Sequence, residues 1–268
     1  MVDVQLPLRA PVIKSRSNQR VVIAHFDQLA RTYTTRYEGP SALAYSFRVH
    51  MERVCDFFDQ PGGRVLDVGC GAGVMVDWLR QQGCEVHGID ISAQMIAVCK
   101  ERFHKMARLH FSVGAIEALP FRDNFFDAVI CKGVLDFVED DSLAIAELAR
   151  VIRPRGTAIL TLQHLPSPSR LWTYYIASRR QHDTLNRHAY RVQTSTRLLQ
   201  SKGLTLQDFV YCNFQVFLKP FDRLLPRQAV WVAEKLERLQ RNRLYGWMAT
   251  GFVIKAIKGS LPQPSCLG

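Results

Sequence analysis

A glycine-rich segment in the first half of the chain has the composition of a ligand-binding turn. Its sequence is Val65-Leu66-Asp67-Val68-Gly69-Cys70-Gly71-Ala72-Gly73, a short apolar run followed by closely spaced glycines. Glycines allow both a tight turn and a close approach of the backbone to a ligand. Asp90 ends a second apolar run 17 residues after Gly73, and a carboxylate there can accept hydrogen bonds from both ribose hydroxyls. This combination predicts a nucleoside site between two strand ends.

The residues around the turn distinguish two kinds of nucleoside ligand. A dinucleotide fingerprint needs a glycine or alanine three residues after its second glycine, so that the helix N-terminus can hold a pyrophosphate. Counted from Gly69 and Gly71, Val74 stands at that position. Asp67, just before the turn, would repel a phosphate but attract a cation. The turn therefore favours an adenosyl ligand that carries positive charge.

Alternating strand and helix patterns place this turn in an α/β fold. The strands are expected at residues 65–68, 86–89, 109–113, 127–131, 157–162, 204–211 and 247–257. Helices are expected at 74–82, 92–104, 141–152 and 194–201, with two more between residues 18 and 60 and a helical insertion at 221–244. Strands that alternate with helices imply parallel βαβ units with helices on both faces. We therefore predict a Rossmann-like seven-stranded sheet, mostly parallel, with a helical N-terminal cap and C-terminal insertions.

The same pattern predicts the domain organisation. A helical cap is expected over residues 1–61, the ligand-binding core over 62–165 and an inserted cap segment over 166–191. Residues 192–258 would complete the sheet and carry a basic amphipathic insertion at about 216–246, followed by a tail over 259–268.

These motifs resemble those of class I S-adenosylmethionine-dependent methyltransferases, in particular the small-molecule branch that includes ubiquinone and menaquinone biosynthesis enzymes. The resemblance covers about residues 20 to 163. It continues through the segments GAIEALPF at 114–121 and NFFD at 124–127, and through the run from Glu147 to Gly156. It implies methyl transfer from S-adenosylmethionine to a small acceptor that is hydrophobic or lipid-like, with oxygen or carbon favoured over nitrogen as the methylated atom.

The resemblance also implies which positions hold the cofactor. Asp67 and the glycine turn would contact its methionine part, Asp90 and Ile91 its ribose and adenine. The full set of expected cofactor-binding residues is Asp67, Gly69, Cys70, Gly71, Gly73, Asp90, Ile91, Met95, Ala115, Ile116, Cys131 and Lys132. The family usually has an acid where Ala115 stands. Its absence should cost one hydrogen bond to the adenine amino group, about 0.5–1.5 kcal/mol.

Catalytic residues are harder to identify, because methyl transfer is an in-line displacement on an activated carbon and depends strongly on positioning. His164 follows the fifth strand and is a candidate general base, or a loop histidine without a role. Tyr33, like Tyr37, matches a lid tyrosine of the family or packs in the core. Asp136 lies near the expected acceptor pocket or caps a helix. No histidine or cysteine has metal-ligand spacing, so no metal is predicted.

Charge is distributed unevenly along the chain. Residues 1–149 contain 16 Lys and Arg against 19 Asp and Glu, whereas residues 150–268 contain 19 against 5. The basic half indicates either an anionic partner or a solvated basic face. Around Trp231 an apolar stripe is interleaved with Lys235, Arg238, Arg241 and Arg243, which is typical of a helix at a membrane surface or of the packing face of a cap.

Other features concern location and alternative functions. Seven scattered cysteines without a C-x-x-C pair indicate reduced thiols, and residues 1–20 lack the apolar segment of a secretory signal. The expected location is the cytoplasm, with peripheral attachment to the inner face of a membrane if the basic helix binds lipid. An RNA methyltransferase is an alternative, but the segment CKGV at 131–134 lacks the motif for base-amine methylation, so a nucleic-acid partner is disfavoured. A protein of this fold that acts as a cyclase or partner subunit is a second alternative.

Overall fold

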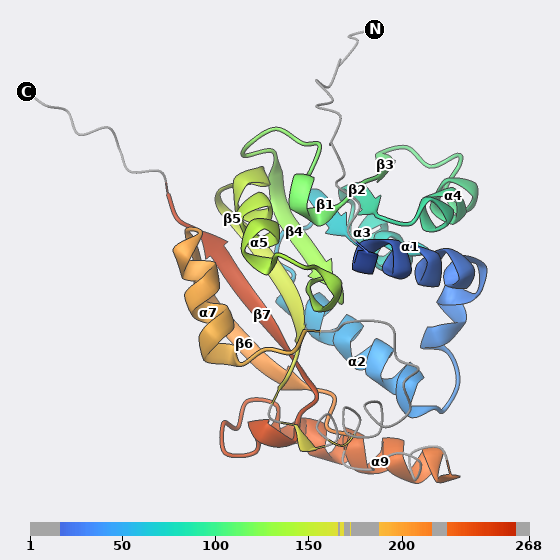
Figure 1. The fold of residues 1–268 in the computed structure, drawn as a ribbon, viewed down its shortest axis with the longest axis vertical. Helices are drawn as coiled ribbons and strands as arrows, with labels where there is room; N and C mark the ends of the chain where they lie inside the picture. The colour runs from blue at the N-terminus through green and yellow to red at the C-terminus, as the bar shows by residue number, and fades with distance from the viewer. Residues whose placement is uncertain (1–16, 166, 169–171, 173–187, 216–223, 261–268) are drawn as a thin grey trace, which may run out of the picture.

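The computed structural model describes residues 17–165, 167–168, 172, 188–215 and 224–260, and the statements below refer to these ranges. They form a seven-stranded sheet in the order β3-β2-β1-β4-β5-β7-β6 (Figure 1). The strands are β1 (Arg64–Val68), β2 (Glu85–Asp90), β3 (Leu109–Val113), β4 (Phe126–Lys132), β5 (Ile152–Gln163), β6 (Leu204–Cys212) and β7 (Gly251–Lys258). The predicted Rossmann-like, mostly parallel sheet is confirmed.

Among the described strands, direction reverses only at β7, next to the edge strand β6. The pairs formed among β1 to β5 are all parallel, whereas β7 pairs antiparallel with both β5 and β6. Two expected boundaries were wrong. β5 begins at Ile152, which pairs with Phe126, and Arg155 at a φ of 63° marks an irregularity where a turn was expected. β7 begins at Gly251 because residues 246–248 form a short 3-10 helix.

Helices cover both faces of the sheet and the carboxyl ends of its strands (Figure 1). They are α1 (Ser17–Leu29), α2 (Ala42–Phe57), α3 (Val74–Gln81), α4 (Ala93–Arg102), α5 (Asp141–Val151), α7 (Val192–Ser201) and α9 (Pro226–Leu236). The 3-10 helices are η1 (Ala30–Tyr37), η2 (Ile116–Ala118), η3 (Leu135–Phe137), η4 (Glu237–Leu239) and η5 (Gly246–Met248). As expected, Ser92 caps α4, its hydroxyl accepting from the Met95 amide at 3.1 Å.

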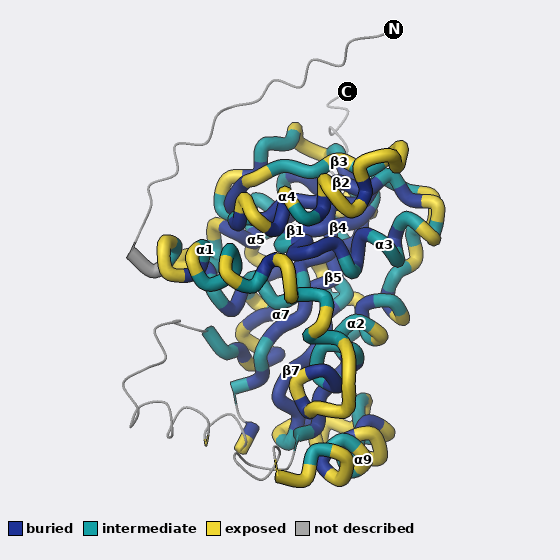
Figure 2. Tube along the Cα trace, turned by 90° about the vertical axis from the view of Figure 1, so that its right-hand side faces the viewer, coloured by how far each residue is buried: buried dark blue, intermediate teal, exposed yellow. Residues whose placement is uncertain are grey.

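Two apolar layers hold the helices to the sheet, one on each face. Successive residues of a strand point to opposite faces, and both faces here are apolar, as in buried parallel strands. On one face Leu66 and Leu160 pack with the side chains of α5 and α7. On the other face Val65 and Ile159 pack with those of α2, α3 and α4. Figure 2 shows this buried interior in dark blue, with exposed positions spread over the outer helices and loops, α1 and α9 among them.

The N-terminal helices close over the ends of the central strands. Phe26 and Leu29 of α1 pack on Met95 of α4. Asp27 adds a polar attachment, because its carboxylate accepts from the Ser92 hydroxyl at 2.5 Å and from the Gln94 amide at 3.3 Å. These contacts hold α1 above the turn between β1 and α3. Among the described residues, no helix has both the length and the apolar character needed to cross a bilayer.

Candidate functional site

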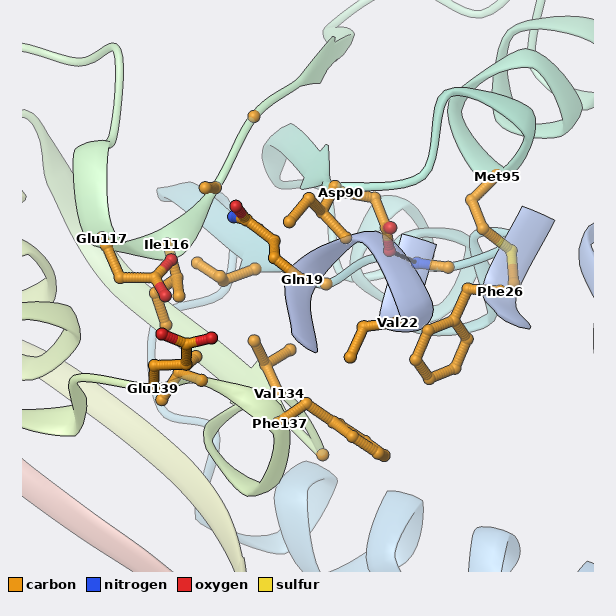
Figure 3. Close-up of a pocket in the computed structure, with 18 of the residues that line it drawn as sticks. Gln19, Val22, Phe26, Asp90, Met95, Ile116, Glu117, Val134, Phe137 and Glu139 are labelled. Atoms are coloured by element: carbon orange, nitrogen blue, oxygen red, sulfur yellow. Dashed lines mark hydrogen bonds between the residues drawn. The ribbon is translucent and has the colours of Figure 1, made fainter. Parts of the chain in front are cut away.

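A cavity of about 270 Å³ lies beneath α1, at the carboxyl ends of β1, β2 and β4. In parallel α/β sheets this edge is where ligands bind. Figure 3 shows Val22 and Phe26 of α1 on one side of the cavity, with Asp90 and Phe137 around it. The residues predicted from sequence that line it are Tyr33, Gly69, Gly71, Asp90, Ile91, Met95, Ala115, Ile116 and Lys132.

The glycine turn forms the floor of the cavity in a conformation that suits glycine. Gly69 and Gly71 have φ angles of 69° and 53°, which lie in the left-handed region that other residues rarely adopt. A Cβ on Gly71 would meet the ring of Tyr33 at 3.2 Å. A Cβ on Gly73 would instead meet Phe103 at 2.6 Å, on the side of α4. Gly69 and Gly71 thus shape the cavity, whereas Gly73 allows close helix packing.

Asp90 joins this turn to the end of β2. Its carboxylate accepts hydrogen bonds from the Gly71 amide and from the Ser92 amide, both at 2.9 Å. The side chain is buried but reaches the cavity, and burial raises the pKa of its carboxyl group. A carboxylate has about four acceptor positions. The carboxylate therefore keeps acceptor capacity for a hydroxyl donor of a ligand, which fits the expected role with a ribose.

Asp67 is a buried carboxylate without a complete set of partners. It is 2 % exposed and, among the described residues, its Oδ2 has no hydrogen-bond donor. Burial raises its pKa to about 7, partly opposed by the positive charge of Lys132. Asp67 does not itself line the cavity but lies directly before Val68 and Gly69, which do. A nearby cation would stabilise its ionised form.

Lys132 is the one cationic side chain among the described residues that line the cavity. Its ammonium donates to the Tyr37 hydroxyl at 2.7 Å and lies 5.1 Å and 5.3 Å from the ring centres of Tyr37 and Phe47. Tyr33 stands beside this group, 5.9 Å from Phe47, and burial raises its pKa to about 12. Tyr33 is therefore a neutral hydrogen-bonding group at physiological pH.

The remaining wall of the cavity is mainly apolar and was not predicted from the sequence. Val22 and Phe26 reach it from α1, and Phe137 meets Phe26 edge to face at 5.5 Å. The other lining residues outside the prediction are Gln19, Val68, Gly114, Glu117, Ala118, Val134, Val138, Glu139, Asp140 and Leu143. The apolar stripe of α1 indicated that one side of this helix is buried, but the sequence does not show which surface or cavity the stripe covers.

Several expected site residues lie away from the cavity. His164 is buried between strand ends, where its Nδ1 lies 3.2 Å from the Ala249 carbonyl and its ring packs on Tyr211 and Phe252. β7 covers it because that strand lies beside β5. Asp136 is also buried, with its carboxylate 3.4 Å from the Gln163 amide. The geometry therefore gives neither residue direct access to a ligand in the cavity.

Two cysteines of the prediction are also outside the cavity lining. Cys131 is fully buried in the layer under α5, whereas the next residue, Lys132, reaches the cavity. Cys70 is buried in the turn, and its thiol lies 3.8 Å from the Gly71 carbonyl. Both cysteines are buried next to residues that line the cavity, without lining it themselves.

Comparisons with known proteins agree with this geometry. A family model described as a methyltransferase domain matches residues 66–160. A ubiquinone biosynthesis O-methyltransferase of Xanthomonas oryzae is 30% identical over 134 residues, which are 48% of this chain and 56% of the relative. A malonyl-acyl-carrier-protein O-methyltransferase of Enterobacter lignolyticus is 36% identical over 112 residues, 41% of this chain and 43% of the relative. The chain thus spans about half the length of the curated relatives it matches.

Solved structures extend the likeness to most of the chain. An S-adenosylmethionine-dependent methyltransferase of Mesorhizobium loti superposes with a TM-score of 0.57 at 18% identity, covering 77% of this chain and 96% of its own. The cyclase SpnF superposes with a TM-score of 0.64 at 18% identity, and the match covers 92% of this chain and 98% of the SpnF chain. At such identities the likeness shows the fold. The methyltransferase-domain model thus matches residues 66–160, and the chain shares the fold of these two solved structures.

Proposed function

We propose that the protein transfers a methyl group from S-adenosylmethionine to a small hydrophobic or lipid-like acceptor, with oxygen or carbon favoured over nitrogen as the methylated atom. The observation that carries the proposal is the pairing of Asp90 and Asp67 around one glycine turn. Asp90 offers acceptors for a ribose, and Asp67 is a buried carboxylate whose ionised form needs a nearby cation. S-adenosylmethionine combines a ribose with sulfonium and ammonium charges, and its sulfonium supplies an already activated methyl group.

The chain's own residues would bind and orient the reactants. Gly69 and Gly71 let the backbone approach the cofactor, and Ile91 and Ile116 offer apolar contacts to an adenine. Phe26, edge to face with Phe137, adds an apolar wall on this side of the cavity. In-line positioning of two reactants in a water-poor cavity supplies much of the acceleration that methyl transfer needs.

Lys132 is the strongest candidate for a direct contact with the acceptor. An ammonium in a mainly apolar cavity stabilises an oxyanion, such as a phenolate or enolate, more strongly than it would in water. Its hydrogen bond to Tyr37 fixes its position. This arrangement supports an acceptor whose nucleophile is an ionisable hydroxyl or an acidic carbon. The two relatives named above are O-methyltransferases, which supports oxygen.

Product analysis with the purified protein tests the proposal. S-adenosylmethionine labelled in its methyl group would be incubated with prenylated phenols, fatty acyl carboxylates and amines, and released S-adenosylhomocysteine would be measured. We expect release with at least one oxygen or carbon acceptor, and loss of that release in Lys132→Met with cofactor binding retained. A Lys105→Met variant, which changes an exposed lysine outside the cavity, is the matched control.

Two outcomes would contradict the proposal. Cofactor binding together with isomerised acceptor and no S-adenosylhomocysteine would favour a cyclase. Tight binding of a dinucleotide in place of S-adenosylmethionine would show that the turn holds a phosphate.

We further infer that α9 and the segment after it meet an anionic membrane surface, at which a lipid-like acceptor would be collected. Trp231 and Leu244 are 60 % and 79 % exposed, so neither belongs to a packing face. The other exposed large apolar residues here are Leu224, Leu225, Tyr245 and Trp247, and the exposed basic ones are Arg227, Lys235, Arg238, Arg241 and Arg243. Exposed apolar and basic side chains on one short segment favour the interface of an anionic bilayer. Cytoplasmic location with peripheral attachment stays a prediction that rests on this surface.

A further inference from the structure

A second cluster of side chains that could bind a ligand lies toward the start of β2 and β3, whereas the cavity lies at the carboxyl ends of the strands. Glu85 begins β2, and His87 follows two residues later on the same face of the sheet. His110 of β3 stands directly opposite His87 in the parallel register. Asp90, which lines the cavity, is the last residue of β2, so the strand separates the two locations.

The three side chains converge on one point. The Glu85 Oε1 atom lies 3.1 Å from His87 Nε2 and 3.9 Å from His110 Nε2. One potential ligand atom from each residue lies within 4.8 Å of the other two. Zinc binds imidazole nitrogen and carboxylate oxygen at about 2.0–2.2 Å, which places tetrahedral ligand atoms about 3.4 Å apart. To reach these distances and aim both imidazole lone pairs at one ion, the exposed His110 ring would rotate out of its stack on His87.

The surroundings fix one ligand and leave another adjustable. His87 is buried, and its ring lies 5.3–5.8 Å from the ring centres of Phe121, Phe125 and Phe126. Its side chain is therefore held in place before any ion binds. The His110 side chain is 55 % exposed and stacks on His87 at 4.5 Å. An ion can thus enter from solvent on the side of His110.

Arg64 is the charged group that opposes a cation here. Its Nε lies 3.2 Å from Glu85 Oε1, and its guanidinium also lies 4.3 Å from the ring centre of Phe125. The carboxylate retains lone pairs beyond those that Arg64 uses, because each oxygen can accept more than one partner. A bound ion would nevertheless share Glu85 with a positive charge, so Arg64 sets an upper limit on affinity.

We propose that Glu85, His87 and His110 form a binding site for a divalent transition-metal ion, with zinc as the first candidate. Two imidazoles and one carboxylate make a ligand set used for zinc, and three protein ligands leave a fourth position for water. The ion would join β3, the edge strand of the sheet, to β2. The site is remote from the cavity and does not depend on the proposed methyl transfer.

The test is a metal titration of the full chain after treatment with a chelator. We expect one zinc ion per chain by calorimetry and a higher thermal unfolding midpoint with zinc than without it. His110→Ala should weaken zinc binding at least about tenfold, since loss of a ligand exceeds typical losses of supporting contacts. Arg64→Met should tighten binding, because it removes the competing charge. His104→Ala changes an exposed histidine in the segment before β3 and is the matched control.

Cobalt in place of zinc identifies the ligand atoms. Nitrogen and oxygen ligands give cobalt d–d absorption without the charge-transfer band of a thiolate, which separates this site from binding by cysteines. His110 is chosen over His87 because its exposed side chain can be truncated without opening the core. Absence of stoichiometric binding, binding that His110→Ala leaves unchanged, or a thiolate band would each overturn the proposal.

Discussion

Burial makes the charge of Asp67 depend on pH close to neutrality. Its pKa is about 7 in the folded chain, against an ordinary value of 3.8. Between these two values the folded chain holds a proton that the unfolded chain has lost. The free energy of unfolding therefore falls as pH rises through this window, and the loss is complete above the folded pKa.

Asp67→Asn should remove this pH dependence, because the amide has nearly the same shape and no charge. In the absence of ligand we expect the variant to unfold at a higher temperature than the native chain at about pH 8.5, with a smaller difference at about pH 5.5. It should also bind S-adenosylmethionine more weakly, because it cannot balance the positive charge of the ligand. Thermal unfolding at several pH values checks the first expectation and calorimetry the second. Parallel pH profiles for the two proteins would contradict the assigned burial of a charge.

Asp90→Ala tests the ribose contact at the neighbouring strand end. The change removes the acceptor for the Gly71 and Ser92 amides as well as any acceptor for a ribose. Hydrogen bonds to a charged group contribute about 1.5–3 kcal/mol each, so cofactor affinity should fall by at least about tenfold. Calorimetric titration with S-adenosylmethionine measures the effect. Asp77→Ala, which removes a carboxylate on α3 outside the cavity, should bind like the native chain.

At this scale the sequence identified the turn well and the walls of the cavity poorly. The sequence identified Gly69, Gly71 and Asp90 because a tight ligand-binding turn requires closely spaced glycines and a ribose site requires an acid at the end of the next strand. Lys132 and Cys131 were both placed at the cavity, yet only Lys132 lines it. One residue of difference along a strand moves a side chain to the other face, and the pleat phase was not known from the sequence. For His164 the sequence did not show that β7, which begins at Gly251, would cover its side chain.

At the scale of elements, one buried carboxylate attaches the C-terminal insertion to the rest of the fold, together with apolar contacts of Val230 and Ala233. Glu237 follows α9 and accepts from the Tyr45 hydroxyl at 3.0 Å and from the Asn213 amide at 2.7 Å. It also accepts from the Phe214 amide at 3.3 Å. This side chain therefore links the segment after α9 to the end of β6 and to α2, which lies far from both in the sequence.

Glu237→Ala should destabilise the chain by about 2–4 kcal/mol, because it leaves buried donors without an acceptor. Glu234→Ala, one turn earlier on the exposed side of α9, should change stability by less than about 0.5 kcal/mol. Denaturant unfolding of the two variants gives the comparison directly. Equal effects would show that Glu237 does not hold the insertion in place.

Elements with a regular period were predicted closely, and irregular joints were not. β3 was placed correctly at residues 109–113, because its flanking turns are clear. The start of β5 was missed because Pro154 and Gly156 usually end a strand, whereas here the pairing of Ile152 with Phe126 continues the strand across them. Tertiary pairing of this kind overrides the local signal.

For the whole molecule, the uneven charge predicts how it distributes between water and lipid. The last 119 residues contain 19 basic and 5 acidic side chains, and α9 presents several of the basic ones to solvent. The attraction should be strongest toward anionic surfaces and should weaken as salt screens it.

Arg227→Glu combined with Arg238→Glu should reduce binding to phosphatidylglycerol-containing vesicles by roughly thirtyfold or more, at about 1 kcal/mol for each basic residue. Trp231→Ser should weaken binding even at high salt, because it removes apolar contact. Co-sedimentation measures both. Lys100→Glu with Lys105→Glu makes the same change of charge near α4 and should have a smaller effect. Equal binding to neutral vesicles, or retention on RNA with none on lipid, would count against this surface.

The position of β7 also has a consequence for synthesis of the chain on the ribosome. β5 has fully buried residues, among them Ile159 and Leu160, yet its partner β7 begins at Gly251, almost 90 residues after β5 ends. At about 5–20 residues per second, the edge of β5 would stay uncovered for on the order of 5–20 s while the remainder is made. An apolar strand edge exposed for that time is a site for chaperones or for aggregation. Yield in the cell should therefore respond to translation speed through residues 164–250.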